Sequence, residues 1–199
     1  GGQYTKSRRL VDTMFCLMKC SKKVLAAVAA LLCCGGMLAA IWQTKEVLGS
    51  AYEDLYPDMY VNTDSEFAKE EGKVVYYTFD DGPSKNTIAI LDTLKEKGVK
   101  ATFFVTGQEV SGVDSDAILK RIVDEGHSIG IHTYSHVYQE IYSSVESYLA
   151  DFHKIREKII QVTGVEPKIF RFPGGSVKNS FASPSVQKAI RIEMRRRGY

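Results

Sequence analysis

The sequence has no cysteine beyond Cys34, no large net charge and no internal repeat. All four cysteines precede residue 35, so the rest of the chain folds without disulfide bonds and is compatible with an oxidising or a reducing compartment. The formal net charge is only +2, which argues against a nucleic-acid-binding protein. The hydrophobic content of 44% and the charged content of 25% are those of an ordinary globular protein.

One long hydrophobic run, residues 24–42, lies near the N-terminus. It carries no charged residue and is long enough to cross a bilayer, which takes about 17–25 residues as a helix. Lysines precede the run and acidic residues follow it, so the positive-inside rule places residues 1–23 in the cytoplasm. We therefore predict a single-pass anchor in the cell membrane, with the rest of the chain outside. A cleaved secretory signal ending near Ala39 and Ala40 is the alternative, and it would export the same domain.

The chain changes character twice after this run. Residues 43–72 are acidic and rich in tyrosine, and their charges follow no clear period. We interpret them as an extracytoplasmic stalk or a loosely docked extension. From Lys73 onward strand-like and helix-like patterns alternate regularly, so residues 73–199 are predicted to form the folded domain.

Short β-prone runs alternate with amphipathic helical patterns through this domain. The predicted strands are 74–79, 101–106, 127–132 and 168–172. The predicted helices begin near Asn86, near Ser115, at a capping box of Ser143 and Glu146, and at Ser183 followed by Pro184, and the first three end at Gly98, Gly126 and Gly164. Strict alternation predicts an α/β fold, either a parallel sheet or a β/α barrel. In such folds functional residues gather at the carboxyl ends of the strands.

Several polar residues of this domain are expected to be structural or solvated. His127 opens a predicted strand, and His153 lies in the middle of a predicted helix. The last predicted helix ends in a basic cluster that we interpret as solvated and stabilised by the helix dipole. Its members are Arg191, Arg195, Arg196 and Arg197.

Residues suited to metal chemistry stand where two of the predicted strands end. Asp80 and Asp81 follow the first strand, and His132 and His136 follow the third. Two imidazoles and one carboxylate are a common ligand set for a divalent ion that keeps open coordination positions. Such an ion would neutralise one aspartate, and the other could act as general base on a metal-bound water.

The fourth predicted strand ends at Arg171, just before a Pro173–Gly174–Gly175 turn. Arg171 could hold the second aspartate ionised, and the bare backbone N–H groups of the turn suit an oxyanion. Taken singly, an Asp-Asp-Gly-Pro sequence is usually a surface turn, a His-x₃-His pair is usually incidental, and an arginine before a turn is usually exposed. Their placement at the ends of successive strands is what predicts a site.

Three motifs at these positions resemble those of the polysaccharide deacetylases with a NodB-homology domain, carbohydrate esterase family 4. TFDDGPS (Thr78–Ser84) is similar to the first motif of that family, HTYSH (His132–His136) to the second, and RFPGG (Arg171–Gly175) to the third. The resemblance covers about residues 73–199. It implies a distorted β/α barrel that removes N-acetyl groups from N-acetylglucosamine polymers. For an exported, membrane-held member it implies peptidoglycan as the substrate, with chitin-type oligomers as the second choice.

The same resemblance implies a role for each matched residue. Asp80 would be the catalytic base, and Arg171 would orient and tune it. The metal would be Zn²⁺, with Co²⁺ or Ni²⁺ as alternatives, and its ligands would be Asp81, His132 and His136. The backbone N–H of Gly174 would help to stabilise the oxyanion. The remaining matched residues, which would shape the cleft, are Thr78, Phe79 and Pro173.

Two departures from the family pattern affect the expected activity. The third motif of the family often has a larger residue, commonly tyrosine, where Gly174 stands, which changes the cleft wall but keeps the backbone N–H. The fourth and fifth motifs of the family, one of which supplies a catalytic acid, would follow Tyr199. We therefore expect a C-terminally truncated deacetylase domain with about the first four β/α units and with slow or absent turnover.

Two other functions fit parts of the pattern. A non-catalytic envelope protein that binds glycan would agree with a missing C-terminal half, but it would not need a general base such as Asp80. A membrane-anchored metalloprotease agrees less well, because HTYSH lacks the glutamate beside the first histidine that a helical protease motif requires. The leading prediction is a metal-dependent hydrolase of non-peptide carbon–nitrogen bonds. Its partners would be a polysaccharide and, through residues 24–42, the lipid bilayer.

Overall fold

The computed structural model describes residues 52–62, 72–176 and 180–199. The chain divides into two compact units, residues 1–51 and 52–199, and the second contains all of the described residues. The predicted cytoplasmic segment and membrane anchor therefore lie outside the described residues. Within the described ranges, no helix combines the length and the hydrophobicity needed to cross a membrane.

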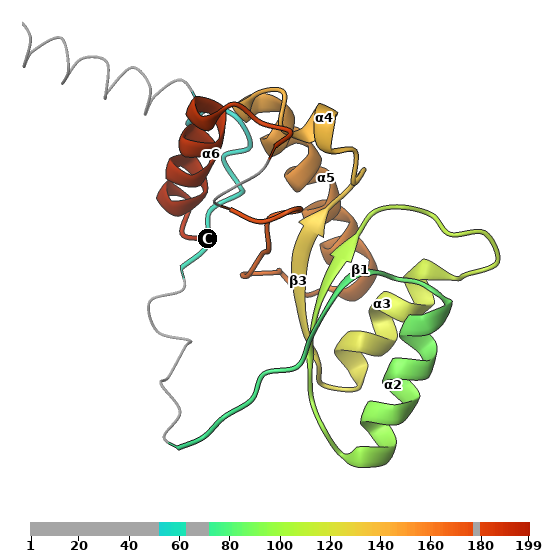
Figure 1. The fold of residues 1–199 in the computed structure, drawn as a ribbon. Helices are drawn as coiled ribbons and strands as arrows, with labels where there is room; N and C mark the ends of the chain where they lie inside the picture. The colour runs from blue at the N-terminus through green and yellow to red at the C-terminus, as the bar shows by residue number, and fades with distance from the viewer. Residues whose placement is uncertain (1–51, 63–71, 177–179) are drawn as a thin grey trace, which may run out of the picture. The chain divides into compact units, whose positions relative to one another are not determined.

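A three-stranded parallel sheet in the order β1-β2-β3 organises the folded unit (Figure 1). The strands are β1 (Thr78–Gly82), β2 (Thr102–Thr106) and β3 (Ser128–Thr133). The central strand, β2, is buried along almost its whole length, as is typical of a parallel strand covered on both faces. The predicted α/β class with a parallel sheet is confirmed. The barrel stays a prediction, because the described strands form an open sheet.

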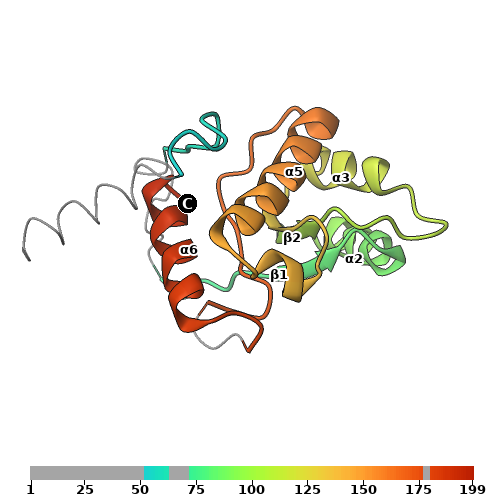
Figure 2. The same ribbon diagram turned by 90° about the horizontal axis from the view of Figure 1, so that it is seen from above.

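Helices follow each strand and lie next to one another in chain order. They are α2 (Lys85–Lys97), α3 (Ser115–Asp124), α4 (Tyr138–Ile141), α5 (Val145–Thr163) and α6 (Pro184–Arg196). α2 packs beside α3, α3 beside α5, and α5 beside α6, an arrangement that can be followed in Figures 1 and 2. Because consecutive strands are neighbours in the sheet, right-handed crossovers place α2 and α3 on the same face.

Glycine and proline signals predicted most helix ends correctly. Gly98 and Gly164 end α2 and α5 in the left-handed conformation, with φ of 64° and 74°, which glycine adopts without a steric penalty. Ser183 caps α6 through its side chain, and Pro184 is the first helical residue.

The predicted capping box at the start of α5 is wrong by one residue. Ser144, and not Ser143, is the N-cap, and its hydroxyl accepts a hydrogen bond from the backbone N–H of Ser147 at 3.1 Å. The hydroxyl of Ser143 instead donates to the carbonyl of Glu140 at 2.7 Å, because α4 ends immediately before it. The short helix α4 itself was not predicted.

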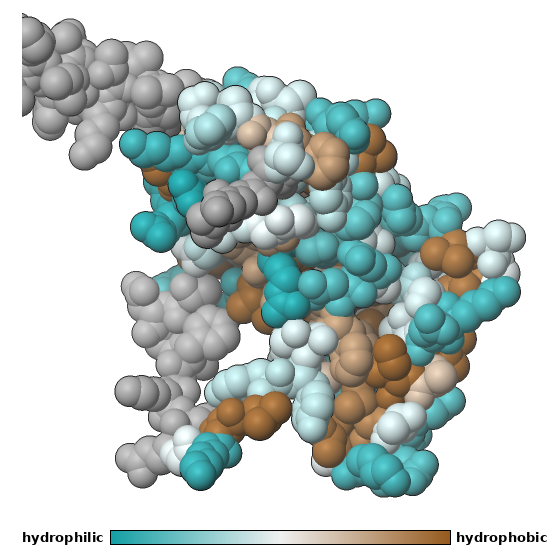
Figure 3. All heavy atoms as spheres, viewed as in Figure 1, coloured by the Kyte–Doolittle hydropathy of each residue, from teal (hydrophilic) through white to brown (hydrophobic). Residues whose placement is uncertain are grey.

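The first strand begins later than predicted. β1 starts at Thr78, whereas residues 74–77 are exposed, and Figure 3 shows apolar side chains at the surface along the segment that leads into β1. The last residue before the strand, Tyr77, accepts a hydrogen bond from the N–H of Thr102 at 2.9 Å. The β-prone run therefore begins before β2 does, and β2 is its only neighbour among the described strands.

The predicted strand at residues 168–172 is wrong in extent and shrinks to a single bridge. Phe170 pairs with Ile131 of β3 in parallel. The N–H of Ile131 donates to the carbonyl of Ile169, and the N–H of Arg171 donates to the carbonyl of Ile131, both at 2.9 Å. This short contact is sufficient to place Arg171 beside the end of β3.

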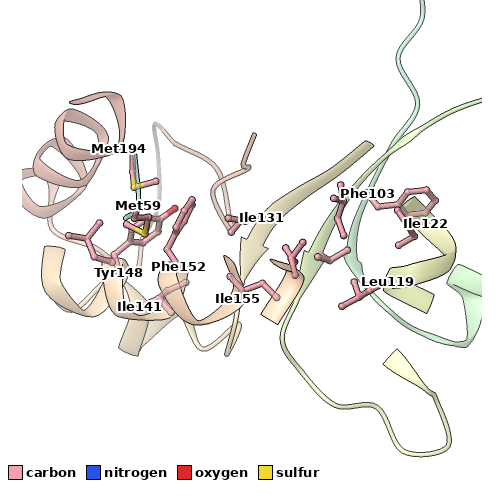
Figure 4. Packing of buried hydrophobic residues seen from close by; sticks show 14 of the residues in the cluster. Met59, Phe103, Leu119, Ile122, Ile131, Ile141, Tyr148, Phe152, Ile155 and Met194 are labelled. Atoms are coloured by element: carbon pink, nitrogen blue, oxygen red, sulfur yellow. The ribbon is translucent and has the colours of Figure 1, made fainter. Parts of the chain in front are cut away.

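The hydrophobic core has two connected parts (Figure 4). Between the sheet and the helices, Phe103 of β2 lies near Ile122 of α3. Between α5 and α6, the fully buried Met59 lies with Tyr148 and Met194. Met59 belongs to residues 43–72, which the sequence led us to interpret as a stalk or a loosely docked extension.

The side chain of Arg197 connects residues 52–62 to α6. It is fully buried and donates hydrogen bonds to the carbonyls of Tyr52 and Leu55 at 2.7 and 2.8 Å, and to Oε1 of Glu193 at 2.7 Å. The interpretation of Arg197 as part of a solvated helix end is therefore wrong. The guanidinium loses its hydrogen bonds to water on burial, and hydrogen bonds to backbone carbonyls and a carboxylate replace them.

Candidate metal centre at the carboxyl edge of the sheet

Irregularities in the sheet present two of the predicted ligands at its carboxyl edge. β1 shifts register against β2 between Asp80 and Gly82, so Asp81 is the extra residue of a bulge. β3 has the same irregularity, and its extra residue is His132, because its two neighbours pair with consecutive residues of β2. A bulge bends its strand and redirects a side chain, and bulges are frequent next to active sites.

The structure brings together the three side chains that were predicted as a ligand set. Oδ1 of Asp81 lies 3.2 Å from Nε2 of His132 and 3.1 Å from Nε2 of His136. One possible ligand atom of each residue lies within 4.8 Å of the other two. The side chain of Asp81 is 61% exposed, whereas that of His132 is 5% exposed, so the cluster opens to solvent on the aspartate side.

The donor atoms of this cluster fit a divalent ion. Nε2 of His136 is buried and makes no hydrogen bond with a described residue, because its 3.1 Å approach to Oδ1 of Asp81 does not have hydrogen-bond geometry. A buried polar atom without a partner is costly, and an ion between the three side chains would provide that partner. Imidazole nitrogens together with a carboxylate oxygen suit a first-row ion such as Zn²⁺.

The ring of His132 is oriented for coordination by its second nitrogen. Nδ1 lies 2.8 Å from the carbonyl oxygen of Arg171. Because a carbonyl can only accept, Nδ1 carries the proton and Nε2 presents its lone pair to the cluster. Burial lowers the pKa of His132 and outweighs the opposing effects of that hydrogen bond and of the charges of Asp81 and Asp80. The neutral imidazole, which is the form that binds metals, is therefore favoured.

Two members of the cluster have an unusual backbone conformation. Asp81 has a φ of 65° and His136 a φ of 57°, in the left-handed region. Among the described non-glycine residues only Tyr56 shares this feature. Such conformations cost about 1–3 kcal/mol each and persist where the surrounding contacts enforce them. The fold therefore maintains both side chains in place at a cost to its stability.

Asp80 faces a different partner from its neighbour. Nη1 of Arg171 donates to Oδ1 of Asp80 at 2.8 Å and to the hydroxyl of Thr78 at 3.0 Å. The same guanidinium lies 4.3 Å from the centroid of the Phe104 ring, so three contacts fix its position. The two adjacent aspartates are thus divided, with Asp81 toward the imidazoles and Asp80 toward the guanidinium.

The predicted oxyanion turn, residues 173–175, follows Arg171 in the sequence and is held by a hydrogen bond to its buried proline. Gly174 and Gly175 are exposed and have φ of 72° and 90°, which favour glycine. The N–H of Gly175 donates to the carbonyl of Phe172 at 3.0 Å. Pro173 is buried, and its carbonyl accepts a hydrogen bond from the Tyr142 hydroxyl at 2.7 Å. No motif marks Tyr142 in the sequence, so this anchor was missed.

The residues predicted to shape a cleft are not all in one place. Thr78 and Phe79 line a pocket of about 430 Å³ that also borders Asp80 and Asp81. Phe79 stacks on Phe103 with 5.2 Å between ring centroids, which supports the wall of this pocket from the core. Pro173 is not among the lining residues and contributes instead to the buried turn.

A second group of possible ligands, Asp58, His153 and Glu157, differs from the first. Nη1 of Arg156 donates to Asp58 at 2.8 Å and to Glu157 at 2.7 Å, so a guanidinium is already hydrogen-bonded to both carboxylates. The ring of His153 stacks on Tyr56 at 4.2 Å. This group therefore joins residues 52–62 to α5 and is a poor competitor for a cation.

A family model described as polysaccharide deacetylase matches residues 68–192. The chain belongs to this family. Within the family, a peptidoglycan-N-acetylglucosamine deacetylase of Bacillus cereus is 32% identical over 160 residues, which cover 80% of this chain and 55% of that protein. A chitin deacetylase of Colletotrichum lindemuthianum is 33% identical over 103 residues, which cover 50% of this chain and 41% of that protein.

Solved structures of deacetylases share this fold. The catalytic domain of a peptidoglycan N-acetylglucosamine deacetylase from Eubacterium rectale superposes with a TM-score of 0.61 and 33% identity, covering 71% of this chain and 62% of that one. The polysaccharide deacetylase Bc1974 from Bacillus cereus gives a TM-score of 0.55 and 34% identity, covering 64% and 58%. The chain thus spans about half the length of the curated relatives it matches, and somewhat more of the solved domains.

Proposed function

We propose that this chain hydrolyses the acetamide of N-acetylglucosamine residues in peptidoglycan. The proposal depends on the division of the two adjacent aspartates, one toward two histidines and the other toward Arg171. Relatives named as peptidoglycan deacetylases support this substrate, and the chitin deacetylase supports chitin-type oligomers as the alternative. A protein that only bound glycan would need no paired base.

The described residues can divide the reaction between them. A divalent ion held by Asp81, His132 and His136 would supply a Lewis acid that lowers the pKa of a water molecule and polarises the acetyl carbonyl. Asp80 would take a proton from the attacking water, with its carboxylate oriented by Arg171. The exposed backbone of the Gly174 turn would face the oxyanion that forms on the acetyl oxygen. The C–N bond then breaks and releases acetate and an amine.

The leaving amine must receive a proton, and the four histidines leave none free for this role. His132 and His136 belong to the ligand set, and His153 stacks on an aromatic ring in the second group. His127 is buried at the opposite edge of the sheet, where Nδ1 accepts the N–H of Ala101 at 3.2 Å. Among the described residues, the protonated carboxyl of Asp80 is the group that could return the proton to the amine.

We also propose that the domain acts outside the cell membrane, anchored by residues 24–42 with residues 1–23 in the cytoplasm. The support is the uncharged run and the lysines that precede it. Protease added to intact spheroplasts would digest residues 73–199 and spare the N-terminal segment. Protection of the domain until the membrane is lysed would contradict this orientation.

The catalytic proposal is tested by measuring acetate release from peptidoglycan and from chitin oligomers by the full chain with added Zn²⁺. Asp80→Asn removes the base and keeps the shape of the side chain, so acetate release is expected to fall by about 10²–10⁴-fold while zinc affinity is retained. Asp92→Asn is the matched control, because Asp92 pairs with Arg121 on the surface of α2. Equal activity of wild type and Asp80→Asn would reject Asp80 as the base, and no acetate release by wild type would reject the proposal that this chain itself hydrolyses the acetamide.

A further inference from the structure

One side chain of α5 holds the loop between the two histidine ligands, residues 133–135 (the ligand loop). Oδ1 of Asp151 accepts hydrogen bonds from the hydroxyl of Thr133 and from the backbone N–H of Tyr134, the latter at 2.6 Å. Oδ2 of Asp151 accepts the N–H of Ser135 at 2.9 Å. Both carboxylate oxygens of Asp151 therefore bind the ligand loop, and none of the three hydrogen bonds caps a helix.

These hydrogen bonds continue to the second histidine ligand. The hydroxyl of Thr133, which donates to Asp151, accepts the backbone N–H of His136 at 3.4 Å. Three consecutive N–H groups thus converge on one carboxylate, directly or through one hydroxyl. Converging backbone N–H groups form a concavity that favours an anion, and hydrogen bonds to a carboxylate are stronger than those between neutral groups. The hydrogen bonds from Thr133, Tyr134 and Ser135 to Asp151, and from His136 to Thr133, are suited to maintain the left-handed φ of His136.

The opposite side of the ligand loop packs on the end of β2. The N–H of Gly107 donates to the carbonyls of Thr133 and Tyr134, both at 3.0 Å. A Cβ atom at Gly107 would collide with the Tyr134 ring, so only glycine allows this approach. Nζ of Lys154 lies 3.9 Å from the centroid of the same ring. The loop is clamped between β2 and α5, and Asp151 supplies the anionic side of the clamp.

We infer that Asp151 is a positioning residue of the metal centre, because its carboxylate sets the backbone of the ligand loop so that His136 faces Asp81 and His132 before an ion binds. The inference rests on the proposed metal site. Asp151 itself contacts the loop and not the cluster. Residues that orient metal ligands from outside typically account for about 10–100-fold in metal affinity.

The test is calorimetric titration of the full chain with ZnCl₂, together with thermal unfolding in the absence of metal. Asp151→Asn replaces one accepting oxygen by an amide that cannot accept, and zinc affinity is expected to fall by about 10–100-fold. Asp151→Glu restores a carboxylate and should recover part of the loss. Asp114→Asn is the matched control, because Asp114 caps α3 by accepting the N–H of Ala117 at 2.9 Å and asparagine can accept the same bond. It should leave zinc affinity unchanged.

A second variant tests the inference even if the Asp151→Asn protein does not fold. Thr133→Val keeps the carboxylate but breaks the link from Asp151 to His136, so it should weaken zinc binding in a folded chain. Wild-type zinc affinity in Asp151→Asn or in Thr133→Val, an equal loss in Asp114→Asn, or no zinc binding by wild type would each overturn the inference. Zinc binding that follows the expected order in a chain that releases no acetate would reject the proposed function and leave this inference standing.

Discussion

Nε2 of His136 lies 3.1 Å from Oδ1 of Asp81, and both residues hold their backbone in the left-handed region to make this approach. The two residues come from different strand ends, and a bulge in β1 turns the aspartate toward the imidazole. The fold itself thus brings the side chains of the candidate centre together, and an arrangement set by the fold lowers the cost of ordering a ligand set.

We expect the folded unit to bind one zinc ion. His136→Ala removes a ligand and should abolish tight binding, whereas His153→Ala should leave the stoichiometry and affinity unchanged. The reason is that Arg156 is already paired with both carboxylates beside His153, and its positive charge disfavours a second cation there. Titration of both variants with ZnCl₂ measures this, and a second zinc ion that disappears in His153→Ala would contradict it.

Replacing Arg171 by lysine should slow acetate release without weakening zinc binding. Lysine keeps the charge but loses the planar group that lies over Phe104 and bonds both Asp80 and Thr78. Misplacement of a catalytic group by about 1 Å costs roughly 10²-fold in rate, and we expect a loss of this order in kcat. His132 is bonded to the backbone carbonyl of residue 171, which the substitution retains. Parallel loss of zinc affinity and of kcat would show that Arg171 supports the ligands instead.

Comparing Tyr142 with Tyr148 tests the hydrogen bond that holds the buried turn at Pro173. Their rings stack at 5.8 Å, but only the hydroxyl of Tyr142 donates to Pro173, while that of Tyr148 is buried without a partner among the described residues. Tyr142→Phe should lower the free energy of unfolding by about 1 kcal/mol, the usual net value of one hydrogen bond. Tyr148→Phe should be neutral or stabilising. Urea denaturation measures both, and equal losses would contradict the assigned bond.

Stability should fall in acid because of Glu193, whose side chain is 4% exposed. Burial by itself would raise the pKa of Glu193, but hydrogen bonds from Arg196 and Arg197 and their charges outweigh burial and lower it below its ordinary value of 4.5. A lowered pKa in the folded state stabilises the fold above the unfolded pKa, and this contribution is lost as the pH falls through the folded pKa. Urea denaturation at decreasing pH below about 5 should show this loss. Glu193→Gln should flatten the profile there, and identical pH profiles would contradict the prediction.

Local sequence patterns predicted the elements that depend on a few neighbouring residues. Alternating periods predicted the order of the first three strands and of α2, α3, α5 and α6, and Gly98 and Gly164 marked helix ends because only a residue without Cβ adopts that conformation freely. The motifs placed Asp81, His132 and His136 at strand ends, which a parallel sheet brings to one edge. These inferences succeed because period and backbone preference act over a single turn or strand.

The motif resemblance gave the two aspartates different roles, and the tertiary structure shows the physical reason for the difference. Asp80 and Asp81 are adjacent and chemically identical in the sequence, and a register shift against β2 turns one toward the imidazoles and leaves the other with Arg171. The hold of Asp151 on the ligand loop and the burial of Arg197 likewise depend on partners far along the chain. Composition and spacing determined which residues this protein has for the site. The positions of their side chains follow from contacts between distant segments, which composition and periodicity do not encode.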